Sequence, residues 1–189
     1  MKKLLMLITV VWLYGMSQAA VTINVNQVGS DIVWDWNGSI DTTGATQVDS
    51  FGGFGAYVRP YYVEFPLYSA PQNTYAYSIT GPSFGAIGDG TVYNWFTTVS
   101  GNTSFGVSGY GTKVYLAQFY VSGSAIYGTN VMANKTISGI GLNSGTYEWT
   151  VSGSGDTITM NVIPEPATAL ILGFGGALIA FYRRFFGRG

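Results

Sequence analysis

The feature that most constrains the fold of this chain is a two-residue alternation of apolar and polar side chains in its middle. Apolar residues occupy every second position in segments 21–25, 147–151 and 158–162. A period of two puts one kind of side chain on each face of an extended strand, so we predict strands with one buried face. The last two segments flank a glycine-rich turn at 153–155, which predicts a hairpin over 146–162.

Further strands are expected between turn signals made of glycine, asparagine and proline. No helical period extends over ten residues between the two ends of the chain. The additional segments predicted as strands are 31–36, 54–65, 75–80, 91–99 and 113–121. Short strands separated by turn signals about every 8–12 residues predict an all-β domain, a β-sandwich of jelly-roll-like form.

The composition restricts the chemistry that this domain can perform. Cysteine and histidine are absent from the sequence, which excludes disulfides, thiolate nucleophiles, the usual zinc and haem ligands and any triad with an imidazole base. Residues 20–163 contain three basic and eight acidic side chains, which gives a net charge of −5. Nucleic acid is therefore not an expected partner, because its phosphates bind clustered lysine and arginine. The sequence assigns no cofactor.

The N-terminus has the order of a secretory signal peptide. Two lysines precede an apolar run over 4–14, and residues 17–19 form a small-x-small cleavage site between Ala19 and Ala20. We expect residues 1–19 to be a signal-peptide helix that the Sec export machinery recognises. The alternative is an N-terminal transmembrane helix, which needs about 20 apolar residues.

The C-terminus carries three features in a fixed order. Pro164, Glu165 and Pro166 keep the backbone extended and accessible. The uncharged segment 167–182 predicts a single transmembrane helix about 24 Å long, and segment 183–189 is basic. The arginines of the basic end are Arg183, Arg184 and Arg188. By the positive-inside rule this end stays in the cytoplasm and the preceding domain is exported.

A Pro-Glu-Pro motif, a short apolar helix and terminal arginines, ending a chain that begins with a signal peptide, resemble the PEP-CTERM sorting signal of Gram-negative bacteria. The resemblance covers residues 164–189, with Ile163 and Ala167 in place of the valine and the serine or threonine that commonly flank the motif. It implies that an exosortase in the inner membrane recognises the motif, cuts close to it and sends the upstream domain to the cell surface or extracellular matrix. It also implies extracellular polysaccharide or biofilm as a partner. The alternative is a single-pass anchor that is never cut.

The sequence is thus divided into a signal peptide (1–19), an exported β domain (20–163) and a sorting tail (164–189). Short motifs of the exported domain resemble a body type that recurs among PEP-CTERM proteins. These motifs are at 29–33, 38–40, 81–85, 120–123 and 141–147. This second resemblance implies a fold and a route but no activity.

Aromatic residues are the candidates for a binding site in the exported domain. Trp34 and Trp36 share one face of the predicted strand 31–36, and many tyrosines add aromatic surface. Sugars stack their apolar faces on such rings, so one hypothesis is a carbohydrate-binding module with Trp34 and Trp36 as its stacking pair. The alternative is that these rings pack the core. The tyrosines are Tyr57, Tyr61, Tyr62, Tyr75, Tyr77, Tyr110, Tyr115, Tyr120 and Tyr127.

Catalysis would require a carboxylate pair, such as Asp31 with Asp35 or Glu64 with Glu148, acting as acid and base on a glycosidic bond. Their spacing fixes no such pair, and we assign no catalytic residue. Aspartates could also bind calcium, but the dense acidic spacing of calcium loops is missing. The aspartates considered for calcium are Asp31, Asp35, Asp41 and Asp49. We therefore expect a non-enzymatic surface or matrix protein without an assigned metal.

Overall fold

The computed structural model describes residues 20–52, 55–68 and 73–164, which form thirteen strands and two 3-10 turns. The strands are β1 (Ala20–Val28), β2 (Asp31–Ser39), β3 (Gln47–Phe51), β4 (Tyr57–Val58), β5 (Phe65–Tyr68), β6 (Thr74–Thr80), β7 (Asn94–Trp95), β8 (Thr98–Gly101), β9 (Phe105–Ser108), β10 (Lys113–Ala117), β11 (Ala125–Met132), β12 (Gly145–Val151) and β13 (Thr157–Ile163). The turns are η1 (Pro60–Tyr62) and η2 (Ser138–Ile140). The prediction of an all-β domain is confirmed.

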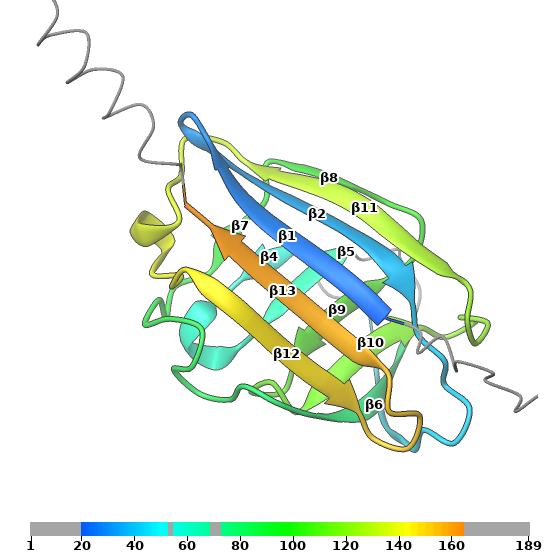
Figure 1. The fold of residues 1–189 in the computed structure, drawn as a ribbon. Coiled ribbons are helices and arrows are strands. Elements are labelled where there is room, and N and C mark those ends of the chain that lie inside the picture. The colour runs from blue at the N-terminus through cyan, green and yellow to red at the C-terminus, as the bar shows by residue number, and fades with distance from the viewer. Residues whose placement is uncertain (1–19, 53–54, 69–72, 165–189) are drawn as a thin grey trace, which may run out of the picture.

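Eleven strands belong to one sheet, in the order β5-β9-β10-β6-β12-β13-β1-β2-β11-β8, with β3 pairing with β6 beside this path. The sheet curls so that its two halves face each other (Figure 1). The front half contains β12, β13, β1, β2, β11 and β8, and the rear half contains β5, β9, β10 and β6. Thr150 and Val151 of β12 join the halves by pairing with β6. On the other side β5 contacts β8, so the sheet is nearly closed. The sequence predicted a jelly-roll-like sandwich, whereas the structure has one continuous, nearly closed sheet that folds over on itself.

The hydrophobic core lies between these two layers. In β1, the alternate residues Val21, Ile23 and Val25 are fully buried, and β13 repeats the pattern. Burial of each such side chain contributes about 1.5–3 kcal/mol. The strands predicted from the two-residue alternation are confirmed, and so is the hairpin over 146–162, which pairs β12 with β13.

Two predicted strands are interrupted in the structure. Segment 54–65 contains only β4 and the first residue of β5, because Pro60 begins η1 and Val63 follows in the left-handed conformation (φ 51°). Segment 91–99 is divided between β7 and β8. Strands β3, β9 and β11 were not predicted.

Asn130 of β11 holds the two edges of the curled sheet together. Its side chain is fully buried; the amide donates to the Leu67 carbonyl of β5, and the side-chain oxygen accepts the Ser100 N–H of β8 at 3.3 Å. Leu67 lies where the register of β5 shifts between Pro66 and Tyr68, a bulge that leaves one residue out of the ladder. A buried side-chain amide therefore bridges the seam between β5 and β8.

The first and last strands lie side by side and run in the same direction. Ala20 is opposite Thr157, and Asn26 is opposite Ile163. The chain therefore enters this layer at one end of the molecule and leaves it at the other (Figure 1). Pro164 follows β13 directly and is exposed.

Most of the predicted targeting segments lie outside the described residues. These are the signal peptide with Ala19, the motif residues Glu165 and Pro166, the transmembrane segment 167–182 and the basic end. Within the described ranges, the structure contains no helix that is both long and apolar enough to span a membrane. The cleavage site, the anchor and the orientation across the membrane stay predictions.

Candidate functional site

Trp34 and Trp36 point into the core, and their side chains are 0% and 2% exposed. The alternation of β2 buries both rings together with Ile32. Trp34 packs edge-on against Phe96 at a centroid distance of 5.7 Å and lies 6.2 Å from Phe65. A sugar cannot reach either ring. The hypothesis that this pair stacks a glycan is therefore wrong, and the alternative, that the rings pack the core, is confirmed.

The carboxylates of Asp31 and Asp35 are not brought together. They lie four residues apart on β2, about 13 Å along an extended strand, whereas the two carboxylates of glycosidases lie roughly 5–10 Å apart. Each carboxylate instead accepts a hydrogen bond from a segment that is distant in the sequence. Asp31 accepts the Asn134 N–H at 2.9 Å, and Asp35 accepts the Thr129 hydroxyl at 2.7 Å. Both bonds tie β2 to β11 and the turn that follows it.

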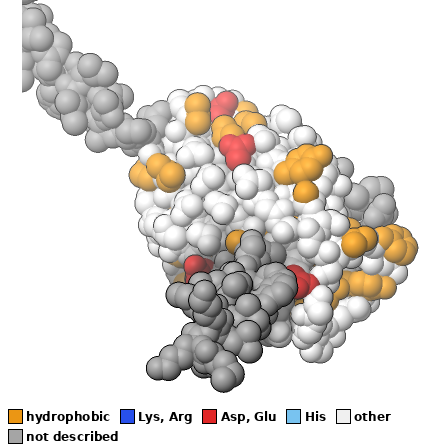
Figure 2. Space-filling model, turned by 45° about the vertical axis from the view of Figure 1, so that its right-hand side comes forward, with side chains coloured by type: hydrophobic (Ala, Val, Ile, Leu, Met, Phe, Trp, Pro, Cys, Tyr) orange, Lys and Arg blue, Asp and Glu red, His pale blue; other side chains and the backbone are white. Residues whose placement is uncertain are grey.

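The second carboxylate pair is divided between the two halves of the sheet. Glu64 directly precedes β5 in the rear half, whereas Glu148 lies on the exposed face of β12 in the front half. Within residues 20–52, 55–68 and 73–164, no three acidic side chains gather in a way that could hold a metal ion. Figure 2 shows carboxylates, but no lysine or arginine side chain, on the visible face of these residues, in agreement with the acidic composition of the domain.

A cleft lined by aromatic side chains lies where β4 and β7 meet the ends of β3, β9 and β10. Its volume is about 520 Å³, within the range of ligand sites in proteins. The lining residues are Phe51, Gly55, Tyr57, Glu64, Tyr93, Trp95, Ser108, Gly109, Tyr110 and Tyr115. We call this site the aromatic cleft. Three of these tyrosines were expected from the sequence as aromatic surface, but Phe51, Tyr93 and Trp95 were not.

Three rings form the inner group of the aromatic cleft. Tyr57 of β4 pairs with Trp95 of β7 in the two-stranded sheet, and their rings meet edge to face at 5.3 Å. Tyr93 lies nearly parallel to Trp95, with centroids 5.9 Å apart and an interplanar angle of 18°. Tyr93 is 47% exposed and Trp95 is 57% exposed. Trp95 rests on the backbone of Gly55, where an added Cβ would overlap the indole ring. Two parallel rings therefore remain open to solvent.

Arg59 connects this inner group to a second group of rings. Its guanidinium lies 3.9 Å from the ring centroid of Tyr62 and 4.3 Å from that of Tyr93, so both rings hold the cation. The same group forms an ion pair with Glu64 at 3.1 Å and donates to the Tyr93 hydroxyl at 3.0 Å and to the Thr91 carbonyl at 3.3 Å. Arg59 thus fixes the positions of two rings that come from separate segments, Tyr62 of η1 and Tyr93 of the loop before β7.

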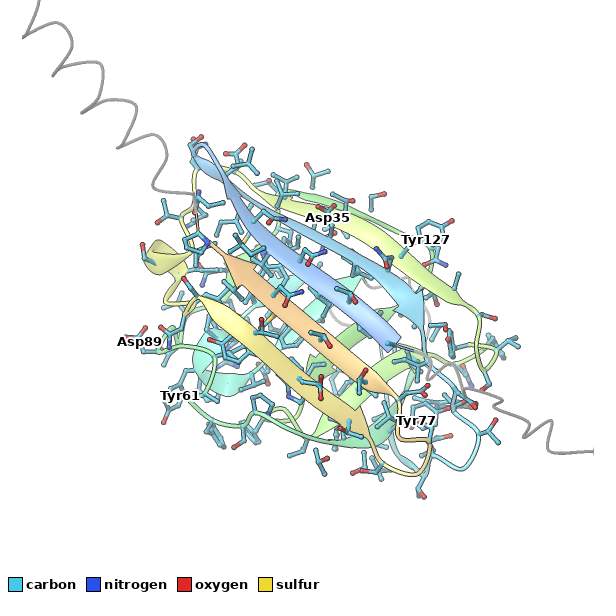
Figure 3. The ribbon with its side chains drawn as sticks, in the orientation of Figure 1. Asp35, Tyr61, Tyr77, Asp89 and Tyr127 are labelled. Carbon is cyan, nitrogen blue, oxygen red and sulfur yellow. The ribbon has the colours of Figure 1, made fainter. Side chains whose placement is uncertain are left out.

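The second group of rings includes a stacked pair, Phe84 and Tyr110, which we call the outer stack. Their centroids are 4.2 Å apart with an interplanar angle of 24°, and about half of each residue is exposed. Tyr62 joins the outer stack to Arg59, lying 6.2 Å from Tyr110. Tyr61 of η1 lies beside them at the edge of the molecule, whereas Tyr127 lies on the opposite side (Figure 3). Tyr110 adopts the left-handed conformation (φ 64°), which sets the direction of its ring.

Polar groups lie beside these rings. Burial, and then the charge of Glu64, raise the pKa of Tyr57 to about 12, so its hydroxyl stays protonated and can donate a hydrogen bond at physiological pH. Glu64 accepts the Ser108 hydroxyl at 3.4 Å in addition to its ion pair. The aromatic cleft therefore combines open ring faces with a hydroxyl donor and a carboxylate acceptor.

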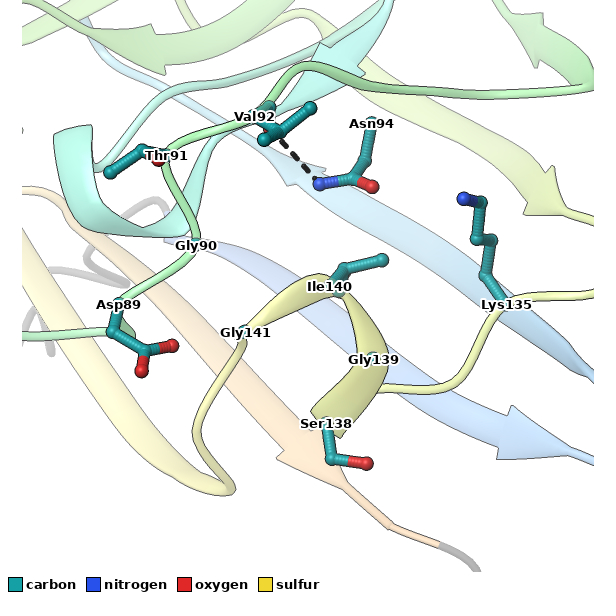
Figure 4. Close-up of a pocket in the computed structure, with 10 residues that line it drawn as sticks. All are labelled: Asp89, Gly90, Thr91, Val92, Asn94, Lys135, Ser138, Gly139, Ile140 and Gly141. Atoms are coloured by element: carbon teal, nitrogen blue, oxygen red, sulfur yellow. Dashed lines mark hydrogen bonds between the residues drawn. The ribbon is translucent and has the colours of Figure 1, made fainter.

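Each basic side chain of the described domain is either paired with a carboxylate or lies outside the aromatic cleft. Arg59 is paired with Glu64, and Lys113 is paired with Asp49 at 2.8 Å. Lys135 lines a different hollow of about 530 Å³, between the loop before β7 and η2 (Figure 4). That hollow is lined largely by glycines and short polar side chains. Within the described residues, the aromatic cleft thus offers no unpaired cation to a ligand.

Among the described residues, several rings, a partly buried ion pair and a hollow coincide at the aromatic cleft. Other tyrosines of the sequence analysis serve the fold, as when the Tyr120 hydroxyl binds the backbone of Ile40 and Ser124. No family model, curated protein or solved structure matches this chain. The assignment of the site therefore depends on its geometry.

Proposed function

We propose that this chain is an exported, non-enzymatic protein whose β domain binds carbohydrate in the aromatic cleft. The observation that carries the proposal is the parallel pair Tyr93 and Trp95, about half exposed, beside the Tyr57 hydroxyl and the Glu64 carboxylate. Aromatic faces bury the apolar face of a sugar, and a few placed polar groups bind its hydroxyls. The folded-over sheet would serve as a sandwich-like scaffold for this site.

Binding without catalysis is the better interpretation of the same residues. Hydrolysis of a glycosidic bond needs two carboxylates that face the bond. Glu64 is the acidic residue among those that line the aromatic cleft, and it is held by Arg59 at 3.1 Å and by the Ser108 hydroxyl. A single carboxylate committed to an ion pair supports recognition of hydroxyl groups rather than acid-base chemistry.

The proposal of export and surface location is supported by the sequence of the two ends. A signal peptide before Ala20 and a PEP-CTERM-like tail from Pro164 onward imply Sec export, a temporary anchor in the inner membrane and processing by an exosortase. Strand β13 ends at Ile163, so the Pro-Glu-Pro motif would follow directly on the folded domain. Such a protein would reach the cell surface or the extracellular matrix, where polysaccharide is available.

Binding can be tested with the purified 20–164 domain by affinity electrophoresis in gels that contain neutral or acidic polysaccharides. We expect retardation by at least one neutral polysaccharide. Trp95→Ala should weaken binding about tenfold, since an aromatic stack contributes about 1–1.5 kcal/mol. Phe119→Ala is the control, because Phe119 is 76% exposed and is not part of the aromatic cleft. Absence of retardation in every gel, or equal retardation of the Trp95 and Phe119 variants, would contradict the proposal.

Export and sorting can be tested separately by the intact mass of the protein recovered from its native cells. Processing as proposed gives a species that begins at Ala20 and ends near Pro164, with or without an attached group. A membrane-bound species that retains Gly189 would show a single-pass anchor instead and would refute exosortase cleavage.

A further inference from the structure

The aromatic rings continue beyond the cleft in an unbroken series. The series runs from Trp95 and Tyr93 through the Arg59 guanidinium to Tyr62 and then to the outer stack. The steps from Tyr93 to Arg59, from Arg59 to Tyr62 and from Tyr62 to Tyr110 measure 4.3, 3.9 and 6.2 Å, so the rings of Tyr93 and Tyr110 are at most about 14 Å apart. A short run of sugar units in an extended chain can span this distance.

Each end of the series has a ring that is about half exposed. Trp95 is 57% exposed at the inner end, and Phe84 is 50% exposed at the outer end. Exposed aromatic side chains that lie next to one another, unlike a single exposed ring, form an apolar patch of the kind that marks binding sites. Between the two ends, Arg59 is enclosed by Tyr62 and Tyr93 and is neutralised by Glu64. The middle of the series therefore has no net charge to attract an ion.

The charge of the domain favours a neutral ligand. The aromatic cleft holds no unpaired cation, and the domain has a net charge of −5. A chain of uronic acids or sulfated sugars would meet repulsion and would find no partner for its anions. Sugars whose hydroxyls are all equatorial keep apolar C–H groups on both ring faces, which suits flat aromatic platforms at two points along one chain.

We infer that the ligand of the aromatic cleft is a neutral, extended polysaccharide of equatorially linked hexoses, bound at two subsites, with Trp95 and Tyr93 at the first and the outer stack of Phe84 and Tyr110 at the second. This inference depends on the proposed function of the cleft. It adds the class of the ligand and a second set of contact residues.

The inference can be tested by calorimetry with β-1,4-linked glucose oligomers and the 20–164 domain, whose strands and core lie within those residues. The affinity for the hexasaccharide should exceed that for the disaccharide at least tenfold. Phe84→Ala should remove this gain and leave the disaccharide affinity unchanged, whereas Trp95→Ala should weaken every oligomer. Phe84→Leu, which keeps the apolar volume but lacks an aromatic face, should resemble Phe84→Ala, and Phe119→Ala should resemble the natural protein. Near-ultraviolet circular dichroism checks that each variant is folded.

The outcomes separate the inference from the proposed function. Equal affinities for the disaccharide and the hexasaccharide, or an unchanged length dependence in Phe84→Ala, would overturn the second subsite while leaving carbohydrate binding intact. Tighter binding of an oligogalacturonate than of the glucose hexamer would overturn the neutral class of ligand. Failure of every oligosaccharide and polysaccharide to bind would overturn both the inference and the proposed function.

Discussion

Replacement of Asn130 by leucine should lower the stability of the domain by a predictable amount. The change removes the donor to the buried Leu67 carbonyl, which costs about 1–3 kcal/mol, and the acceptor for the partly exposed Ser100 N–H, which costs about 0.5–1 kcal/mol. The added apolar surface of leucine returns up to about 1 kcal/mol. We therefore expect a net loss of about 2 kcal/mol. For a domain of this size, the loss corresponds to a decrease in Tm of about 6 °C.

Thermal unfolding of the 20–164 domain, followed by circular dichroism, measures this decrease. Thr129→Val is the matched control on the same strand, because the Thr129 hydroxyl binds Asp35 on the exposed surface, where such a bond contributes about 0.5 kcal/mol or less. Asn130→Asp should be more harmful than Asn130→Leu, since an ionised carboxylate cannot donate to the Leu67 carbonyl and is itself buried. A leucine variant that unfolds within 2 °C of the natural protein would refute the role of Asn130 at the seam.

Three further predictions concern the site, the core and the response to pH. Gly55→Ala should displace the Trp95 ring and weaken carbohydrate binding severalfold without unfolding the domain, and unchanged affinity would contradict the contact between them. Trp149→Phe should destabilise the domain about 1 kcal/mol more than Trp34→Phe, as measured by urea unfolding. The reason is that the buried Trp149 indole donates a hydrogen bond to a carbonyl at 3.0 Å, whereas the Trp34 indole has no hydrogen-bond partner in the described structure. Equal losses of stability in the two variants would contradict this explanation. Hydrogen bonds, of which that from a serine hydroxyl has the largest effect, lower the pKa of the exposed Asp41 carboxyl. The stability that Asp41 contributes is therefore present above about pH 4 and is lost as the pH falls through the lowered pKa. Asp41→Asn should therefore have a flatter dependence of Tm on pH between about 5 and 2, and parallel curves for the two proteins would exclude this contribution.

The sequence could predict the strands that have one buried and one exposed face. Strands β1 and β13 alternate strictly because one face of each packs against the core. The unpredicted β9 is buried at all four positions, and the unpredicted β3 is exposed at all five, so neither one alternates. A strand within the layers and a strand at an edge lack the period on which the prediction depends. The curling of one sheet cannot be predicted from the alternation either, because it depends on only two residue pairs between β6 and β12.

The candidate site could not be located from the sequence, although its residue types could. Alternation makes Trp34 and Trp36 appear to be a matched pair on one face, but it does not say whether that face is the core or the surface. The exposed rings Trp95 and Tyr110 lie in a two-residue strand and a turn, where no period exists. They line one cleft only because β7, β9 and β10 converge there. Binding sites on turns and strand ends are fixed by tertiary contacts, which a local pattern does not record.

The parallel pairing of β1 with β13 determines how the domain would respond to a mechanical load. A pull on the C-terminal end of β13 acts along the strand, so it strains the hydrogen bonds to β1 on one side and to β12 on the other in shear. Bonds loaded in shear share the force and must break together, whereas bonds loaded at the end of a hairpin open one after another. If the domain is tethered beyond Ile163 while its aromatic cleft binds a polysaccharide, the pairing of β13 with β1 and β12 would therefore oppose its extension.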